Sequence, residues 1–219
     1  LMLAGAMSVI FSNMDRIMLG TMAGASEVGM YAAGTTVSRA FSFAAIALSG
    51  ITFPDISRGF TKSPELGIRR LEKLMCILNL YAYITIGFIW LFAENIITLA
   101  LGDEYRESSA IIKIHVITFL FIYAGMVRNT FLTVKEKTKL VIHSTLVGLA
   151  VNVICNYLLI PIYGAEGAAY ATVIAAVCAN VLSNVLHPLT RYFLTIQIRQ
   201  FFLLGLPSIV VGLGLKTKA

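Results

Sequence analysis

Apolar residues fill long stretches of the chain, and short charged segments interrupt them at intervals. Uncharged runs extend over residues 74–93, 140–165 and 167–190, which are 20, 26 and 24 residues long. A helix of about 20 apolar residues crosses a bilayer, so each run is long enough to be a membrane span. The apolar residues are continuous and do not alternate, which favours helices over the strands of a membrane barrel.

The same pattern predicts an all-α fold, a polytopic transmembrane helical bundle. Charged segments and prolines mark the boundaries of six spans, and a seventh helix begins near Phe201. The segments between the spans read as loops. The six predicted spans lie near residues 1–20, 28–53, 74–93, 112–134, 140–161 and 167–189.

Composition strengthens the membrane interpretation, since 58% of the 219 residues are hydrophobic and 13% are charged. Lys and Arg follow the second, fourth and sixth spans and are scarce after the first, third and fifth. Basic loops stay cytoplasmic, so the net charge of +6 reflects topology and no nucleic-acid partner is needed to explain it. The basic residues of the predicted inside loops are Arg58, Lys62, Arg69, Arg70, Lys73, Lys135, Lys137, Lys139, Arg191 and Arg199.

A few charged residues remain within the predicted spans or at their ends. Such charges cost from about 3 to more than 10 kcal/mol unless they find a partner, water or the interface. Lys113 begins the fourth span and can extend its ammonium to the outer surface. Arg39 lies roughly 16 Å into the second span, near the bilayer centre. The complete set is Asp15, Arg16, Arg39, Lys113 and Arg128.

Charge balance among these residues indicates an anionic ligand or a hydrated cavity. Asp15 is the only acid within the predicted spans, and one carboxylate does not neutralise Arg16, Arg39 and Arg128. Guanidinium groups match phosphate oxygens in bidentate geometry. The alternative is a packing ion pair between Asp15 and Arg16 or Arg39.

Uncharged polar residues at helical spacing accompany the charges. Those of the second span form one stripe with Arg39, which we expect to face the bundle interior. Those of the fifth and sixth spans either contact sugar hydroxyls or a coupling ion, or join helices as polar contacts. The predicted cavity-lining residues besides Asp15 are Tyr31, Thr35, Ser38, Ser42, Asn152, Asn156, Asn180 and Asn184.

Motifs of catalysis and of metal binding are missing from the sequence. There is no Walker-type phosphate loop, no nucleophile elbow and no H-E-x-x-H motif, so we expect no enzyme and no cofactor. The three cysteines and three histidines lack metal-ligand spacing, and no metal site is predicted. The chain begins on an apolar run without a basic leader, and we expect it to be a fragment.

Several segments, in order, resemble bacterial polysaccharide transporters. Met14-Asp-Arg-Ile-Met-Leu-Gly20, Glu27-Val-Gly-Met-Tyr-Ala-Ala33 and Phe53-Pro-Asp-Ile-Ser-Arg58 resemble the seventh and eighth helices of these proteins. Leu101-Gly-Asp-Glu-Tyr105 and the segment from Leu159 to Ala169 resemble later signatures. These transporters are O-antigen and capsule repeat-unit flippases, in the superfamily of the lipid II flippase and of multidrug and toxic compound extrusion (MATE) transporters.

The resemblance implies one six-helix lobe of a MATE-like two-lobe transporter, plus the start of a seventh helix. Residues 1–190 would form the C-terminal lobe, and residues 191–219 a cytoplasmic loop and part of an additional helix. The substrate would be a polyprenyl-pyrophosphate-linked oligosaccharide, moved to the outer leaflet of a bacterial inner membrane by secondary transport. Partners would be membrane lipids, the missing N-terminal lobe and polysaccharide polymerase machinery. The pyrophosphate would bind to Arg39 first, then Arg16 and Arg128, while Asp15 would tune the arginines or couple an ion.

Two other functions fit the sequence. A multidrug exporter shares the implied fold, but it would more naturally use acidic cavity residues for organic cations, which the excess of arginine argues against. A membrane scaffold subunit would use the polar stripes only to join helices. An integral-membrane enzyme ranks last, because no cluster of His, Asp and Ser lies near one interface.

Overall fold

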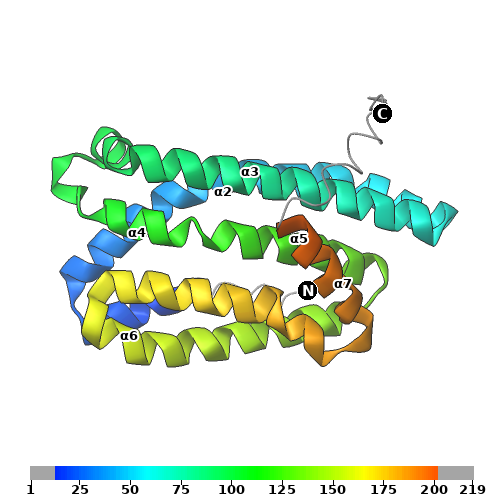
Figure 1. Cartoon of the computed structure of the whole chain (residues 1–219). Helices are drawn as coiled ribbons and strands as arrows, with labels where there is room; N and C mark the ends of the chain where they lie inside the picture. The colour runs from blue at the N-terminus through cyan, green and yellow to red at the C-terminus, as the bar shows by residue number, and fades with distance from the viewer. Residues whose placement is uncertain (1–12, 202–219) are drawn as a thin grey trace.

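The computed structural model describes residues 13–201, and within this range the chain is helical apart from short turns (Figure 1). The predicted all-α fold is confirmed for this part of the chain. The predicted seventh helix near Phe201 lies almost entirely outside the described residues. The helices are 13–22, α2 (Ala25–Lys62), α3 (Pro64–Leu101), η1 (Asp103–Tyr105), α4 (Ser108–His115), α5 (Thr118–Val134), α6 (Thr138–Asn180), η2 (Leu182–Leu186) and α7 (Pro188–Phe201).

Four of these segments are long and apolar enough to cross a membrane. They are Ala25–Lys62, Pro64–Leu101, Ser108–Val134 and Thr138–Leu186. The described chain therefore has the character of a membrane protein. The number of passes, the two-lobe architecture and the identity of the membrane stay predictions.

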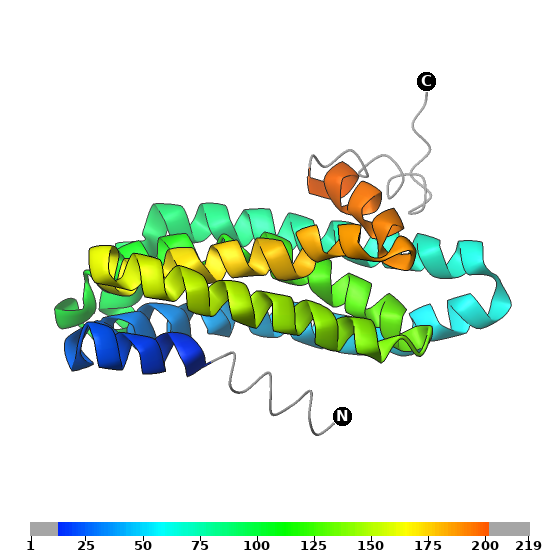
Figure 2. The same ribbon diagram turned by 90° about the horizontal axis from the view of Figure 1, so that it is seen from below.

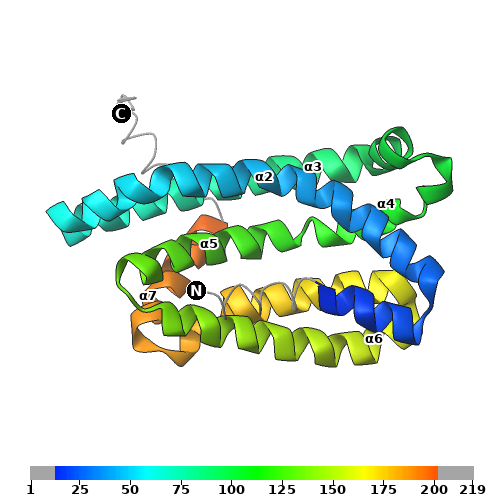
Figure 3. The same cartoon turned by 180° about the vertical axis from the view of Figure 1, so that it is seen from behind.

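Helix α6 is a hairpin of two antiparallel arms, which lie side by side in Figures 1 and 3. The chain reverses at Gly164, whose φ of 54° and ψ of −130° are not helical. The Ala165 N–H, at the start of the second arm, donates to Glu27 Oε2 at 2.6 Å. We refer to residues 138–163 as the first arm and 165–180 as the second arm. They correspond to the two spans predicted over 140–161 and 167–189.

The structure departs from the predicted boundaries where helices continue into charged sequence. The segment between the second and third spans, expected as a loop, instead forms the ends of α2 and α3, which meet at Ser63. Ser63 Oγ accepts from the Leu66 N–H at 3.1 Å, and Pro64 begins α3, so the turn is a helix cap. Residues 191–200, expected as a loop, belong to α7. Hydropathy marks only the apolar part of a helix, and capping decides where it ends.

The fourth and sixth predicted spans are also divided. The fourth span, predicted over 112–134, bends between α4 and α5. The sixth span stops at Asn180 and is followed by the short helix η2, so residues 182–189 do not continue the helix. Next to this break, Arg128 Nη1 donates a hydrogen bond to the Ala179 carbonyl at 3.0 Å.

The connections between helices separate into two groups at opposite ends of the bundle. The α2–α3 and α5–α6 connections and η2 lie together at one end (Figures 1 and 3), and most of the Lys and Arg residues belong to these segments and the helix ends beside them. The turn before α2, η1 and the reversal in α6 lie at the other end. We call these the inner and outer ends, following the distribution of Lys and Arg.

The larger apolar core lies between α2, α3 and α5, and α7 covers part of it. Phe193 of α7 is fully buried, with its ring 4.8 Å from that of Phe131. Helix 13–22 and α7 lie on opposite sides of the bundle in Figure 2. A smaller core joins helix 13–22, α2 and the second arm of α6, around Leu19, Tyr31 and Ala168.

Gly167→Ala tests the close packing of the α6 hairpin. A methyl group at Gly167 would overlap the Leu159 carbonyl, which is backbone and does not rotate away. We expect the substitution to cost about 1–3 kcal/mol of stability, measured as a lower midpoint of thermal unfolding of the full-length protein in detergent. Gly87→Ala, on α3 with no atom within 4 Å of the new methyl, is the control. Equal midpoints for the two variants would contradict the hairpin geometry.

Candidate functional site

Asp15 is a buried carboxylate, 5% exposed, that accepts hydrogen bonds from uncharged groups. Its Oδ2 accepts from the Tyr31 hydroxyl at 2.6 Å and from Thr172 Oγ1 at 3.0 Å. Its Oδ1 accepts from Asn152 Nδ2 at 2.8 Å and from Asn156 Nδ2 at 2.7 Å. No ion pair joins Asp15 to Arg16 or Arg39 within the described residues. The packing ion pair considered from the sequence is therefore not formed here.

This Asp15 cluster joins segments that are far apart in the sequence. Asp15 comes from helix 13–22, Tyr31 from α2, and the remaining donors from the two arms of α6. Asn152 and Asn156 are four residues apart and so share one face of the first arm. The Asn156 side chain also donates to Asn152 Oδ1 at 3.2 Å, while its own Oδ1 is buried without a partner. The cluster thus holds one oxygen atom, Asn156 Oδ1, beyond those used in its own hydrogen bonds.

Arg39 lies beside this cluster, in a cavity of about 260 Å³ that is also lined by Asp15, Tyr31 and Ser42. Arg39 itself is exposed. A second cavity of about 450 Å³ continues toward the inner end and shares Ile46, Ile122 and Thr172 with the first. We call the two together the cavity face. Its other polar residues are His115 in the first part, and Arg128, Asn129, Ser144, Thr145 and Asn180 in the second.

Several residues predicted to line a cavity instead form hydrogen bonds with other protein groups inside the bundle. Thr35 Oγ1 donates to the Tyr31 carbonyl at 2.8 Å, and Ser38 Oγ lies 2.7 Å from His115 Nδ1. Asn152 and Asn156 contact Asp15 and do not reach the cavity face. Arg16 is partly buried and lines neither part of the cavity face. Its role in binding pyrophosphate stays a prediction.

The structure also brings forward residues that the sequence left unassigned. His115 is not among the cavity-lining residues predicted from the sequence, yet it lies on the wall of the first cavity. Asn129 follows Arg128 directly and lines the second cavity. His115 and Phe119, which line the same cavity, are four positions apart, so helical spacing was the available signal. It could not show which face of α4 was toward the cavity.

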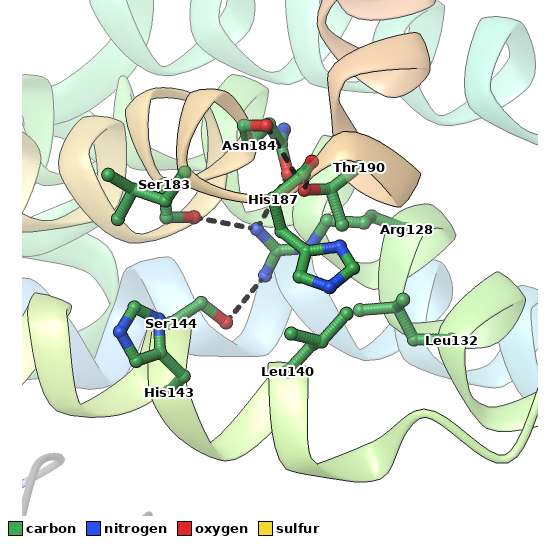
Figure 4. Close-up of a pocket in the computed structure, with 10 residues that line it drawn as sticks. Arg128, Leu132, Leu140, His143, Ser144, Ser183, Asn184, His187 and Thr190 are labelled. Carbon is green, nitrogen blue, oxygen red and sulfur yellow. Dashed lines mark hydrogen bonds between the residues drawn. The ribbon is translucent and has the colours of Figure 1, made fainter.

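Arg128 is 2% exposed and lies at the centre of a second polar cluster (Figure 4). All three guanidinium nitrogens donate to protein acceptors, which is the favourable outcome for a buried arginine. A phosphate would have to displace one of these acceptors, and the proposed role of Arg128 in binding pyrophosphate stays a prediction. The acceptors are Ala179 O and Ser183 Oγ at 3.0 Å, Asn184 Oδ1 and Asn129 Oδ1 at 3.1 Å, and Ser144 Oγ at 2.9 Å.

Uncharged acceptors satisfy the hydrogens of Arg128 but do not balance its charge. Asn184 faces this cluster and not the cavity face, and it also donates to Gln197 Oε1 of α7 at 2.9 Å. The Arg128 cluster therefore links α5, the two arms of α6, η2 and α7. The Ala179 carbonyl, at the C-terminal end of the second arm, accepts from this cation, which is a favourable place for a positive charge.

Comparison with known proteins gives one distant similarity. Over 179 residues the chain is 23% identical to the capsular polysaccharide biosynthesis protein CapF of Staphylococcus aureus. The matched region covers 81% of this chain and 45% of that protein, so the chain spans less than half the length of this relative. No protein-family model matches the chain, and no solved structure matches it.

Arg128→Met tests whether this side chain holds the inner end together. The substitution leaves buried acceptors unpaired, and we expect the free energy of unfolding to fall by about 3 kcal/mol. The free energy of unfolding of Arg128→Lys should lie between those of Arg128→Met and the wild type, because an ammonium supplies three donors. The measurement is a denaturant titration of the full-length protein in micelles.

Arg106→Met is the matched control, because it removes an arginine from an exposed ion pair. Arg106 Nη2 lies 2.8 Å from Glu94 Oε2, and both side chains are at least half exposed. Such pairs contribute about 1 kcal/mol or less. A loss for Arg128→Met no larger than that for Arg106→Met would contradict the structural role of the Arg128 cluster.

Proposed function

We propose that this chain is one lobe of a flippase for polyprenyl-pyrophosphate-linked oligosaccharides, acting in polysaccharide biosynthesis at a bacterial inner membrane. The observation that carries the proposal is Arg39, an exposed guanidinium on the wall of a cavity within an apolar helical bundle. A charge at this place is costly in lipid, and an anionic ligand or water compensates the cost. Pyrophosphate supplies oxygens that match a guanidinium.

The similarity to a capsular polysaccharide biosynthesis protein supports the same pathway class. The resemblance of the sequence segments to polysaccharide transporters adds the expectation of a second, N-terminal lobe. In a two-lobe transporter that lobe would close the cavity face, and the open wall at Arg39 would become an enclosed chamber. Oligosaccharide hydroxyls would then contact the uncharged polar residues beside Arg39, such as Ser42 and Tyr31.

Asp15 supplies the coupling part of the proposal. The Asp15 carboxylate, the hydroxyl oxygens of Tyr31 and Thr172 and the unpartnered Asn156 Oδ1 are the kind of ligand atoms that hard cations prefer. A buried carboxylate is also a site for proton exchange. Because the Asp15 cluster ties helix 13–22 to α2 and both arms of α6, a proton or a Na⁺ ion bound there changes how these helices hold together. Ion binding at Asp15 would in this way bias the opening of the cavity.

A multidrug exporter is the second candidate, because Asp15 lines the same cavity as Arg39. An organic cation would need an accessible carboxylate. Asp15 is almost fully buried and already accepts hydrogen bonds from four side chains, which favours the flippase.

Arg39→Ala in the full-length protein is expected to abolish export of surface polysaccharide while membrane abundance stays normal. Loss of about 3 kcal/mol of charge-assisted hydrogen bonding corresponds to a reduction of about a hundredfold in substrate affinity. Arg39→Lys should restore export only in part, because an ammonium lacks the bidentate fork. Arg58→Ala, which removes an exposed arginine at the inner end of α2, is the control.

The assay is surface polysaccharide staining in cells, followed by transport of the glycolipid into vesicles that contain the purified protein. Wild-type export by a stably inserted Arg39→Ala protein would refute the role of Arg39. A strict requirement for ATP in the vesicles would refute secondary transport.

Asp15→Asn tests ion coupling without changing side-chain shape. In vesicles with an imposed Na⁺ or pH gradient, wild-type transport should increase with one of the two gradients. We expect Asp15→Asn to lose about tenfold or more of this stimulation, the size of a typical coupling between sites. Asp103→Asn makes the same chemical change at an exposed position of the outer end and should respond as wild type. An unchanged gradient response in Asp15→Asn would exclude Asp15 as the coupling site.

A further inference from the structure

A third cavity lies at the inner end, separate from the cavity face. Its volume is about 320 Å³, and it shares only Arg128 and Ser144 with the cavity face. Its walls come from the end of α5, the start of the first arm of α6, η2 and the start of α7. We call it the inner-end pocket. Its lining residues are Arg128, Leu132, Leu140, His143, Ser144, Ser183, Asn184, Leu186, His187 and Thr190.

The inner-end pocket is electropositive. Arg128 forms its floor and, as described above, is hydrogen-bonded only to uncharged acceptors, so its charge acts on whatever fills the pocket. The segments 128–144 and 182–191, which build the pocket, contain five Lys or Arg residues and one Glu. This charge attracts an anion, and a low-dielectric surrounding strengthens the attraction.

Two histidines at the pocket carry free hydrogen-bonding groups. His143 and His187 are both exposed, whereas Arg128 is buried beneath them. The Leu189 N–H donates to His187 Nδ1 at 3.2 Å, which leaves Nε2 of His187 as the ring N–H donor. Figure 4 shows the His187 ring beside the Arg128 guanidinium, with His143 next to Ser144 on another wall. An anion in the pocket therefore meets two imidazoles in front of a fixed guanidinium.

Apolar side chains complete the pocket and continue outside it. Leu132, Leu140 and Leu186 line the cavity, and Leu186 is 63% exposed. Leu182 and Val185, on the same short helix, are also exposed. An inorganic anion gains nothing from such a surface. A molecule that carries a phosphate next to hydrocarbon contacts both the positively charged pocket and the apolar surface beside it.

We propose that the inner-end pocket binds the phosphate of an anionic phospholipid from the membrane leaflet at the inner end. The phosphate accepts hydrogen bonds from His143 and His187, with the Arg128 charge behind them. The acyl chains lie against Leu182, Val185 and Leu186. The lipid then bridges the first arm of α6, η2 and α7, close to the point where the second arm of α6 ends at Asn180. This proposal is independent of the transported substrate and of the proposed flippase activity.

The test measures lipid binding by the full-length protein, without transport. Purified protein with the substitution Leu186→Trp is placed in phosphatidylcholine vesicles, and brominated phosphatidylglycerol or brominated phosphatidylcholine is added as quencher of the new tryptophan. We expect phosphatidylglycerol to be preferred by about fivefold, which corresponds to about 1 kcal/mol for the single charge of Arg128 behind the histidines. The double substitution His143→Gln with His187→Gln should reduce the preference, because the imidazoles that hold the phosphate in front of Arg128 are lost.

Two further variants keep the result interpretable. His187→Lys places a cationic donor at this position and should keep or raise the preference, even if the Gln variants are poorly folded. Lys62→Gln removes an exposed positive charge at the same end but outside the pocket, and should behave as wild type.

Equal quenching by the two brominated lipids in wild-type protein would overturn the proposal. Inorganic phosphate at millimolar concentration provides the second arm of the test. If it displaces phosphatidylglycerol and by itself raises the unfolding temperature of the protein in neutral detergent, the pocket is a site for free phosphate and the lipid assignment fails. We expect phosphate to do neither.

Discussion

A carboxylate buried among apolar helices is stable only where hydrogen-bond donors surround it, because lipid supplies none. Asp15 meets this condition with two asparagine amides and two hydroxyls. Those donors come from α2 and from both arms of α6, so the positions of these helices around helix 13–22 follow from the need to satisfy one side chain. The reversal at Gly164 matters for the same reason, since it brings Asn156 and Thr172 to the same carboxylate.

Arg128 imposes the equivalent constraint at the inner end, with the opposite sign. Its guanidinium needs acceptors, and it finds one at the C-terminal end of the second arm and others on η2 and the first arm. The end of that arm, the short helix η2 and the direction of α7 all accommodate this one group. Each of these two buried charges thus organises one part of the α6 hairpin.

Arg39 differs from both, because it is exposed on the cavity wall while the polar residues around it are largely used within the protein. The three arginines of the predicted spans therefore have three environments. One faces an open cavity, one is enclosed by protein acceptors, and Arg16 lies partly buried outside the cavity face. This distinction supports assigning ligand binding to Arg39 first and a structural task to Arg128.

The sequence by itself determined the helical class, the approximate positions of the apolar spans, the grouping of basic residues at one end and the presence of Asp15, Arg39 and Arg128 as charges within those spans. These features depend on composition and on periodicity along one chain, both of which are local. The tertiary structure decided that Asn152 and Asn156 donate to Asp15 and that Ser183 and Asn184 accept from Arg128. It also decided that α7 is a helix packed on the core. Partners of a buried charge come from other helices, and helical periodicity gives the face of a residue but not the neighbour that the face meets.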